Sequence, residues 1–252
     1  MRLLRLDRDK CNLEDSLQVY MQPIFDIDNF SVVGGEALIR SKATAFEKVT
    51  NNSVSALELI NKNGWYLELD YFVLKNICEF INLNKHRITK QISVNLCKET
   101  IEIEGVADKF IKLIEGYNID RELIAFEVNE KTNFENKNTS DNLNKLNTFD
   151  IEIMLDDFGF GDTSLILISS YNVTTVKLDK IFLNNLTEKR IKAVKGMIEF
   201  LTNLDIKIVI EGVENKEQLD IIRGLGKCDV QGYLLGKPVD METYLKLYAK
   251  DL

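Results

Sequence analysis

Residues 151–157 read IEIMLDD, an isoleucine-rich apolar run that ends in two adjacent aspartates. Short apolar runs with β-branched residues are typical of buried strands. Similar runs recur along the chain, and most are followed by a longer stretch in which apolar residues have helical spacing. The predicted strands are Val19–Ile24, Ser31–Leu38, Gln91–Asn95, Leu123–Val128, Ile151–Leu155, Thr174–Leu178, Ile206–Ile210 and Lys227–Gln231.

Strands that alternate with helices predict an α/β fold with a parallel sheet. Eight such strands in 252 residues favour a single (β/α)8 (TIM-type) barrel, whose usual length is about 250 residues. The first two strands are close enough to pair as a hairpin, and helices are predicted over Val54–Lys62 and Glu68–Leu83. Two later helices are marked by the apolar residues Leu143, Leu146 and Phe149, and by Ile191, Val194, Met197, Ile198 and Leu201. A doubly wound open sheet is the alternative, but no GxGxxG follows an early strand.

The composition is that of an ordinary globular protein, with 45% hydrophobic and 29% charged residues. The only prolines, Pro23 and Pro238, lie near opposite ends, and no Pro/Gly/Ser-rich linker divides the chain. We therefore expect a short lead-in over residues 1–16 and one barrel over 17–252. The charged N-terminus does not resemble a signal peptide, and no apolar run is long enough to span a membrane. A cytoplasmic protein without a membrane segment is expected.

The residue inventory excludes several kinds of chemistry. The four cysteines are scattered and His86 is the only histidine, which argues against zinc sites and against Ser-His or Cys-His catalysis. The net charge of −8 disfavours a nucleic-acid polymer as partner. The chemistry that remains uses carboxylates, amides, lysine or metal ions.

Polar residues recur at the same place in successive predicted units, near the end of each strand. In a barrel the carboxyl ends of the strands converge on one face, where the active site lies. Clustered carboxylates repel one another, and hard ions such as Mg²⁺ or Mn²⁺ would relieve that repulsion. Two adjacent aspartates suit a pair of ions, a common device for phosphodiester hydrolysis. Any one of these residues could instead be a solvated loop residue or a helix cap, so spacing alone does not identify a substrate. The residues are Glu36, Asn95, Glu127, Asp156, Asp157, Lys177, Glu211 and Gln231.

Several motifs occur in a fixed order that resembles the EAL domain, the cyclic di-GMP phosphodiesterase of bacterial signalling. They are YMQPIFD (20–26), GGEALIR (34–40), SVNL (93–96), FEVNE (126–130), LDDFGFG (155–161), VKLD (176–179), VIEGVE (209–214) and QGYLLGKP (231–238). The resemblance covers about Leu17 to Leu247. It implies a modified TIM barrel with an antiparallel first strand, and a metal-dependent hydrolysis of cyclic di-GMP to linear pGpG.

The resemblance also implies roles for individual residues. Lys177, Glu36 and Glu211 match catalytic positions, Lys177 beside the attacking water and Glu211 as general base or ligand of a second ion. Glu130 matches a glutamate that braces the loop after the paired aspartates, a loop that bears on metal binding and on formation of a homodimer. The implied ligands of two Mg²⁺ or Mn²⁺ ions are Glu36, Asn95, Glu127, Asp156, Asp157 and Glu211. The implied substrate-binding residues are Gln22, Arg40, Lys177, Glu214, Gln231 and Tyr233.

Two departures from the family pattern leave an alternative open. Residues 160–165 read FGDTSL, where Asp162 replaces an aromatic residue, and Ser41 follows EALIR where the family often has tryptophan. Neither change removes a matched ligand. The altered loop favours, as the alternative, a catalytically weak EAL-like receptor that binds cyclic di-GMP. An unrelated barrel enzyme, such as a metal-dependent lyase, is a more remote alternative.

Overall fold

The computed structural model describes residues 13–42, 56–159, 168 and 171–249. Most of the predicted lead-in, residues 1–12, lies outside these ranges, as does the altered loop Phe160–Leu165.

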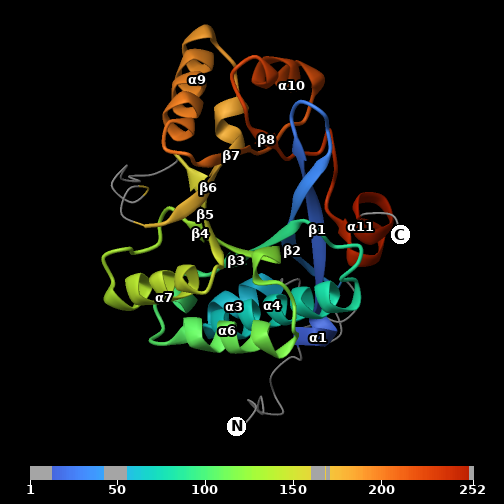
Figure 1. Ribbon diagram of the computed structural model, residues 1–252, viewed down its shortest axis with the longest axis vertical. Coiled ribbons are helices and arrows are strands. Elements are labelled where there is room, and N and C mark those ends of the chain that lie inside the picture. Colours follow the sequence, from blue (N-terminus) through green and yellow to red (C-terminus); the bar gives the residue numbers. More distant parts are fainter. Residues whose placement is uncertain (1–12, 43–55, 160–167, 169–170, 250–252) are drawn as a thin grey trace.

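The strands form one closed barrel in which β1 runs antiparallel to both of its barrel neighbours (Figure 1). The sheet order is β2-β3-β4-β5-β6-β7-β8-β1-β9, and a further pairing of β1 with β2 closes it. The pairs from β2 to β8 are all parallel. The prediction of a modified TIM barrel with an antiparallel first strand is thus confirmed. The strands are β1 (Leu17–Asp26), β2 (Val32–Ser41), β3 (Gln91–Leu96), β4 (Ile124–Asn129), β5 (Glu152–Phe158), β6 (Val173–Leu178), β7 (Lys207–Ile210), β8 (Asp229–Val230) and β9 (Val239–Asp240).

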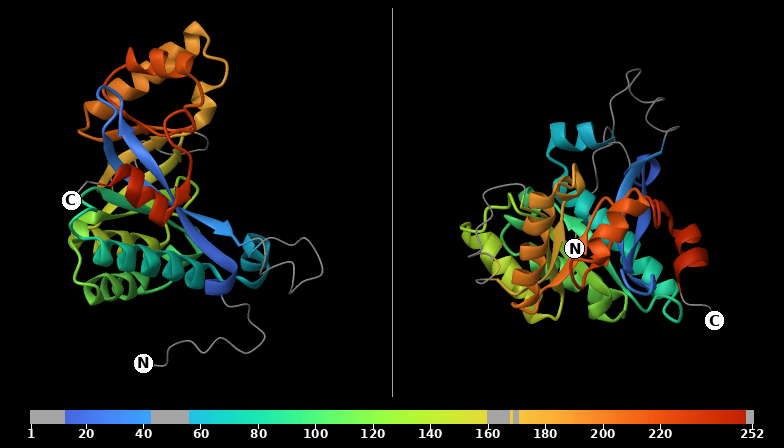
Figure 2. Two further views of the ribbon diagram at one scale, coloured as in Figure 1. Left: turned by 90° about the vertical axis from the view of Figure 1, so that its right-hand side faces the viewer. Right: turned by 90° about the horizontal axis from the view of Figure 1, so that it is seen from above.

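The predicted hairpin is the β1–β2 pair, which runs as one long twisted ribbon (Figure 2). Its turn is held by Asp26, whose carboxylate accepts the backbone N–H groups of Asp28 and Asn29 at 2.9 and 3.0 Å. Such Asx turns are a local alternative to regular pairing and reverse the chain direction. The pairing register places Gln22 opposite Glu36.

Helices cover the outside of the barrel (Figure 1). The helices α4, α6 and α7 lie together near β3 to β5, α9 and α10 lie near β7 and β8, and α11 lies beside β1. The bounds are α1 (Leu13–Ser16), α3 (Ala56–Asn63), α4 (Tyr66–Leu83), α5 (Lys98–Ile101), α6 (Val106–Gly116), η1 (Arg121–Leu123), α7 (Lys137–Thr148), η2 (Lys180–Leu183), α9 (Glu188–Thr202), α10 (Lys216–Arg223) and α11 (Met241–Tyr248).

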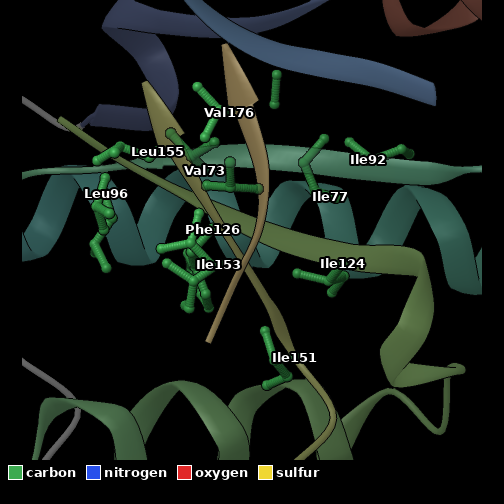
Figure 3. Close-up of a cluster of buried hydrophobic side chains, with 14 of the residues drawn as sticks. Val73, Ile77, Ile92, Leu96, Ile124, Phe126, Ile151, Ile153, Leu155 and Val176 are labelled. Atoms are coloured by element: carbon green, nitrogen blue, oxygen red, sulfur yellow. The ribbon is translucent and has the colours of Figure 1, made fainter. Parts of the chain in front are cut away.

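The hydrophobic core lies between the outer face of the barrel and these helices (Figure 3). Alternate residues of a strand point to opposite faces, so Ile124, Phe126 and Val128 of β4 share the helix-facing side. Phe126 stacks on Phe110 of α6 with ring centroids 5.4 Å apart. The other residues of each strand point into the barrel, which leaves Glu127 facing the interior. The alternation therefore separates an apolar outer layer from the polar interior that forms the site.

The differences from the predicted elements are small and fall at element ends. The strand predicted over Lys227–Gln231 is reduced to β8, Asp229–Val230, and Leu123 closes a 3-10 turn rather than opening β4. Phe149 follows α7 instead of ending it. The two-residue strand β9 has no apolar run that would reveal it, because its pairing with β1 depends on tertiary contact.

Asp70 gives the fold a pH-dependent element outside the site. This residue of α4 is buried, and its carboxylate accepts the backbone N–H of Cys97, just after β3, at 3.0 Å. Burial outweighs that hydrogen bond and raises the pKa of Asp70 from 3.8 to about 6. The native state therefore binds the proton more tightly than the unfolded chain does. This contribution to stability is complete below pH 3.8 and is lost as the pH rises through 6.

We expect Asp70→Asn to gain stability relative to the wild type as the pH rises from 4 to 7, by up to about 3 kcal/mol. Asparagine keeps an acceptor for the Cys97 N–H but carries no charge to desolvate. Urea unfolding of both proteins across this range, without divalent ions, measures the difference. A difference that does not change with pH would show that Asp70 is not the titrating group.

Candidate active site

Lys177 lies at the centre of the site, fully buried inside the barrel. Its ammonium Nζ lies 2.7 Å from a carboxylate oxygen of Glu127, 2.7 Å from one of Glu211 and 3.0 Å from one of Glu36. Asp156 is slightly farther, at 3.6 Å. The four carboxylates come from β2, β4, β5 and the residue after β7. The structure thus brings together residues that are far apart in the sequence; Glu36 and Glu211 are separated by 175 positions.

Two amides complete the surroundings of Glu36. Asn95 of β3 donates from Nδ2 to Glu36 Oε1 at 2.9 Å, and Gln231, directly after β8, donates from Nε2 to Oε2 at 2.9 Å. Since Asn95 uses its nitrogen here, its carbonyl oxygen remains available as a ligand. Each strand-end residue predicted from the sequence, except Asp157, is therefore in direct contact with another member of this cluster.

Asp157 lies near two members of the cluster, Asp156 and Glu211, but does not contact Lys177. Carboxylate oxygens of Asp156, Asp157 and Glu211 all lie within 4.8 Å of one another. All three side chains are half-buried. Such a set of hard oxygen donors is of the kind that binds Mg²⁺, Mn²⁺ or Ca²⁺.

The charges of the site are not balanced by the protein alone. Burial, with repulsion from Glu36 and Asp156, raises the pKa of Glu127 well above its usual range. Burial also raises the pKa of Asp156, and it raises the pKa of Glu211 to about 7. Burial opposes the charge of Glu36 as well, but the Lys177 ammonium and the two amide donors hold the pKa of Glu36 below its usual value. One ammonium cannot neutralise this many carboxylates, so either protons or added cations must do so.

The unused acceptors fit added cations. Glu127 Oε1 and Asp156 Oδ1 are buried and accept no hydrogen bond from the described residues, although Asp156 Oδ1 lies 3.6 Å from the Lys177 ammonium. A buried acceptor without a partner costs free energy, and a bound cation would supply the missing interaction. The donor set and these two oxygens are therefore compatible with a divalent-ion site.

The carboxyl end of β5 and the residue after it are held by Asn129 and Glu130 at the end of β4. Asp157 has a positive φ of 57°, and Gly159 has a φ of 89°. The Gly159 N–H donates to Glu130 Oε2 at 3.1 Å, so Glu130, for which a bracing role is predicted, contacts the first residue after β5. Asn129, which the sequence analysis did not single out, donates from Nδ2 to Asp157 Oδ2 at 2.7 Å. The available signal was its place two residues after Glu127, on the same face of the strand.

The remaining predicted substrate-binding residues interact with groups other than the Lys177 cluster. The Arg40 guanidinium donates to the carbonyl of Ile39 at 2.8 Å, and Gln22 donates to the carbonyl of Gly236 at 3.0 Å. Tyr233 is exposed, with the Lys237 ammonium 5.7 Å from its ring centroid. Glu214 is also exposed. Within the described part of the chain, no hydrogen bond or ion pair joins these side chains to the Lys177 cluster, although Gln22 is paired with Glu36 in the strand register.

The described helices include none that is both long and apolar enough to cross a bilayer.

Comparison with known proteins relates this chain to one family. A model of the EAL domain matches residues 8–238. The probable cyclic di-GMP phosphodiesterase PdeB of Escherichia coli (strain K12) is 28% identical over 251 residues, which cover 97% of this chain and 48% of PdeB. The bifunctional diguanylate cyclase/cyclic di-GMP phosphodiesterase MucR of Pseudomonas aeruginosa is 28% identical over 238 residues, which cover 92% of this chain and 34% of MucR. The chain thus spans about half or less of the length of these curated relatives.

Solved structures agree with the family model. The PaMucR phosphodiesterase in its c-di-GMP complex superimposes with a TM-score of 0.79 at 27% identity, covering 90% of this chain and 99% of that one. An EAL domain protein from Listeria monocytogenes EGD-e has the same fold, with a TM-score of 0.78 at 24% identity and 98% of each chain covered. With its barrel, its antiparallel first strand and a family match over most of its length, this chain belongs to the EAL domain family.

Proposed function

We propose that this chain is a metal-dependent phosphodiesterase that hydrolyses cyclic di-GMP to linear pGpG. The observation that carries the proposal is the buried Lys177 ammonium among the carboxylates of Glu36, Glu127, Asp156 and Glu211. The proposal is also supported by the activities named for the relatives, which this chain matches over nearly its whole length.

The proposed cofactor is a pair of Mg²⁺ or Mn²⁺ ions. When bound, such ions would activate a water molecule and neutralise the charge that develops on the phosphate. The residues that would hold them are Glu36, Asn95, Glu127, Asp156, Asp157 and Glu211.

The side chains of the protein then have separate tasks. Lys177 holds three carboxylates in place through contacts of 2.7–3.0 Å and keeps a positive charge beside the reacting phosphate. Glu211 is proposed either as the general base or as a ligand of the second ion, and in the metal-free protein burial raises its pKa to about 7. Burial of these groups inside the barrel strengthens every charge interaction among them.

Substrate recognition is assigned to residues at the mouth of the barrel. Arg40 presents a guanidinium, which suits a phosphate because it can donate two parallel hydrogen bonds. Gln22, Glu214, Gln231 and Tyr233 complete the proposed pocket. The proposal further takes the protein to act in the cytoplasm and to form a homodimer.

The test is incubation of the purified chain with cyclic di-GMP and either Mg²⁺ or Mn²⁺, with nucleotides separated by chromatography. We expect pGpG to accumulate, and we expect EDTA or Glu36→Ala to abolish its formation. Tight binding of cyclic di-GMP without pGpG would instead support the receptor alternative, for which the sequence of the loop Phe160–Leu165 is the one favourable feature. Neither binding nor turnover with either metal would contradict both.

A further inference from the structure

We propose that Asn129 is a positioning residue that fixes the Asp157 carboxylate for one of the divalent ions. This inference rests on the proposed metal site. Asn129 was not predicted as a site residue from the composition or from the spacing of strand ends. It contacts a candidate metal ligand and not the reacting groups.

The Asn129 amide is fixed at both of its ends. Its Oδ1 accepts the backbone N–H of Lys131 at 3.0 Å, while its Nδ2 donates to Asp157 Oδ2 at 2.7 Å. A flipped amide would lose both hydrogen bonds, because oxygen and nitrogen would exchange places. The donor therefore faces Asp157, and its orientation does not depend on Asp157 itself.

Asp157 needs such a constraint because of its backbone. Its φ of 57° lies in the left-handed region, which non-glycine residues adopt rarely and at a cost in free energy. Two neighbouring hydrogen bonds join the same segments: the Glu130 N–H donates to the Asp156 carbonyl at 3.3 Å, and the Gly159 N–H donates to Glu130 Oε2 at 3.1 Å. Asn129 adds the only one of these three bonds that reaches a candidate ligand side chain.

The chemistry of the contact explains why an amide suits this position. A neutral donor occupies Asp157 Oδ2 and leaves the charge on the carboxylate, so the other oxygen can face an ion together with Asp156 and Glu211. A carboxylate at position 129 would place acceptor against acceptor and repel Asp157. Partners of this kind, which orient a ligand without touching the metal, typically change metal affinity 10- to 100-fold when removed.

The test is Mn²⁺ binding, measured by calorimetry and by electron paramagnetic resonance without substrate, on Asn129→Ala and on the isosteric Asn129→Asp. We expect the weaker of two Mn²⁺ sites to lose about 10-fold or more in affinity in Asn129→Ala. The loss should be larger in Asn129→Asp, which has the same size as the native side chain. In an Asp157→Ala background, Asn129→Ala should leave the affinity of the remaining ion unchanged.

Asn133→Ala is the matched control. Asn133 is exposed in the same loop, and its Oδ1 accepts the Glu135 N–H at 3.2 Å, which is the same local turn that Asn129 makes with Lys131. The Asn133→Ala variant therefore loses a local turn of the same kind but no contact to Asp157. We expect it to bind Mn²⁺ with the affinities of the wild type.

The outcomes separate this inference from the proposed function. If the wild type binds two Mn²⁺ ions and hydrolyses cyclic di-GMP while Asn129→Ala binds both ions with native affinity, the positioning role is wrong and the function stands. The role is also wrong if Asn129→Ala still weakens binding when Asp157 is absent. If the wild type binds no divalent ion at all, the metal site and the role of Asn129 fail together.

Discussion

Lys177→Met is expected to destabilise the metal-free protein by about 3–5 kcal/mol at pH 8, the usual cost of removing one partner from a buried ion pair. The native ammonium lies within 3.0 Å of three carboxylates, and the surrounding charges raise the pKa of Lys177 well above its usual value although burial opposes its charge. Methionine has a similar length but leaves Glu36, Glu127 and Glu211 without their shared counter-ion.

The pH dependence of this loss distinguishes charge from packing. Carboxylates that lose their counter-ion can instead take up protons, so the deficit should shrink when the pH is lowered from 8 to 5. Divalent ions at pH 8 should restore part of the lost stability by the same argument. Urea unfolding at the two pH values, with and without Mg²⁺, measures both effects.

Lys207→Met is the control for removal of a lysine charge. Lys207 is largely exposed and lies 3.6 Å from Glu152, so its loss should change the unfolding free energy little. A deficit for Lys177→Met that is equal at pH 5 and pH 8 and insensitive to Mg²⁺ would indicate lost packing. The electrostatic account of the site would then be wrong.

The central cluster could be predicted from the sequence because, in a barrel, residues at equivalent places in successive strands lie close together in space. Glu127 and Lys177 lie near the carboxyl ends of apolar runs, while Glu36 lies within β2, and the parallel register of β2 to β7 brings the three to one region of the barrel. A period of two along β4 places Glu127 inside while Phe126 faces α6. Two simple regularities thus determine most of the site.

What the sequence did not predict depends on contacts that have no local pattern. Asn129 is a polar residue at a strand end like many others, and only the backbone geometry of Asp157 gives it a particular partner. Arg40 and Tyr233 were assigned by resemblance. The Arg40 guanidinium donates to the Ile39 carbonyl, and the Tyr233 ring lies near the Lys237 ammonium, so neither contact involves the cluster. A long side chain such as that of Arg40 has many rotamers of similar free energy, so the sequence alone does not place it.

The final prediction concerns Asp156→Asn, which we expect to lower the turnover of cyclic di-GMP about 10³-fold. Asp156, like Glu211, belongs to both halves of the site: it lies 3.6 Å from the Lys177 ammonium and also groups with Asp157 and Glu211. Asparagine keeps the shape but removes an anionic ligand. A loss of several kcal/mol of transition-state stabilisation by a metal ion corresponds to about three powers of ten in rate.

Stability should change in the opposite direction from activity. Burial, with the repulsion of Glu36 and Asp157, raises the pKa of Asp156 despite the attraction of Lys177, so ionisation of this group opposes folding of the metal-free protein. The neutral variant should therefore unfold at the same or a higher urea concentration than the wild type at pH 8, while its turnover falls.

Asp220→Asn is the control for the loss of one charge. Asp220 is an exposed residue of α10, and this substitution should alter neither stability nor turnover. Undiminished turnover in Asp156→Asn would show that the acidic cluster is not the catalytic centre. If Asp156→Asn is inactive but at least as stable as the wild type, the activity of this chain depends on a carboxylate whose ionisation opposes folding of the metal-free protein.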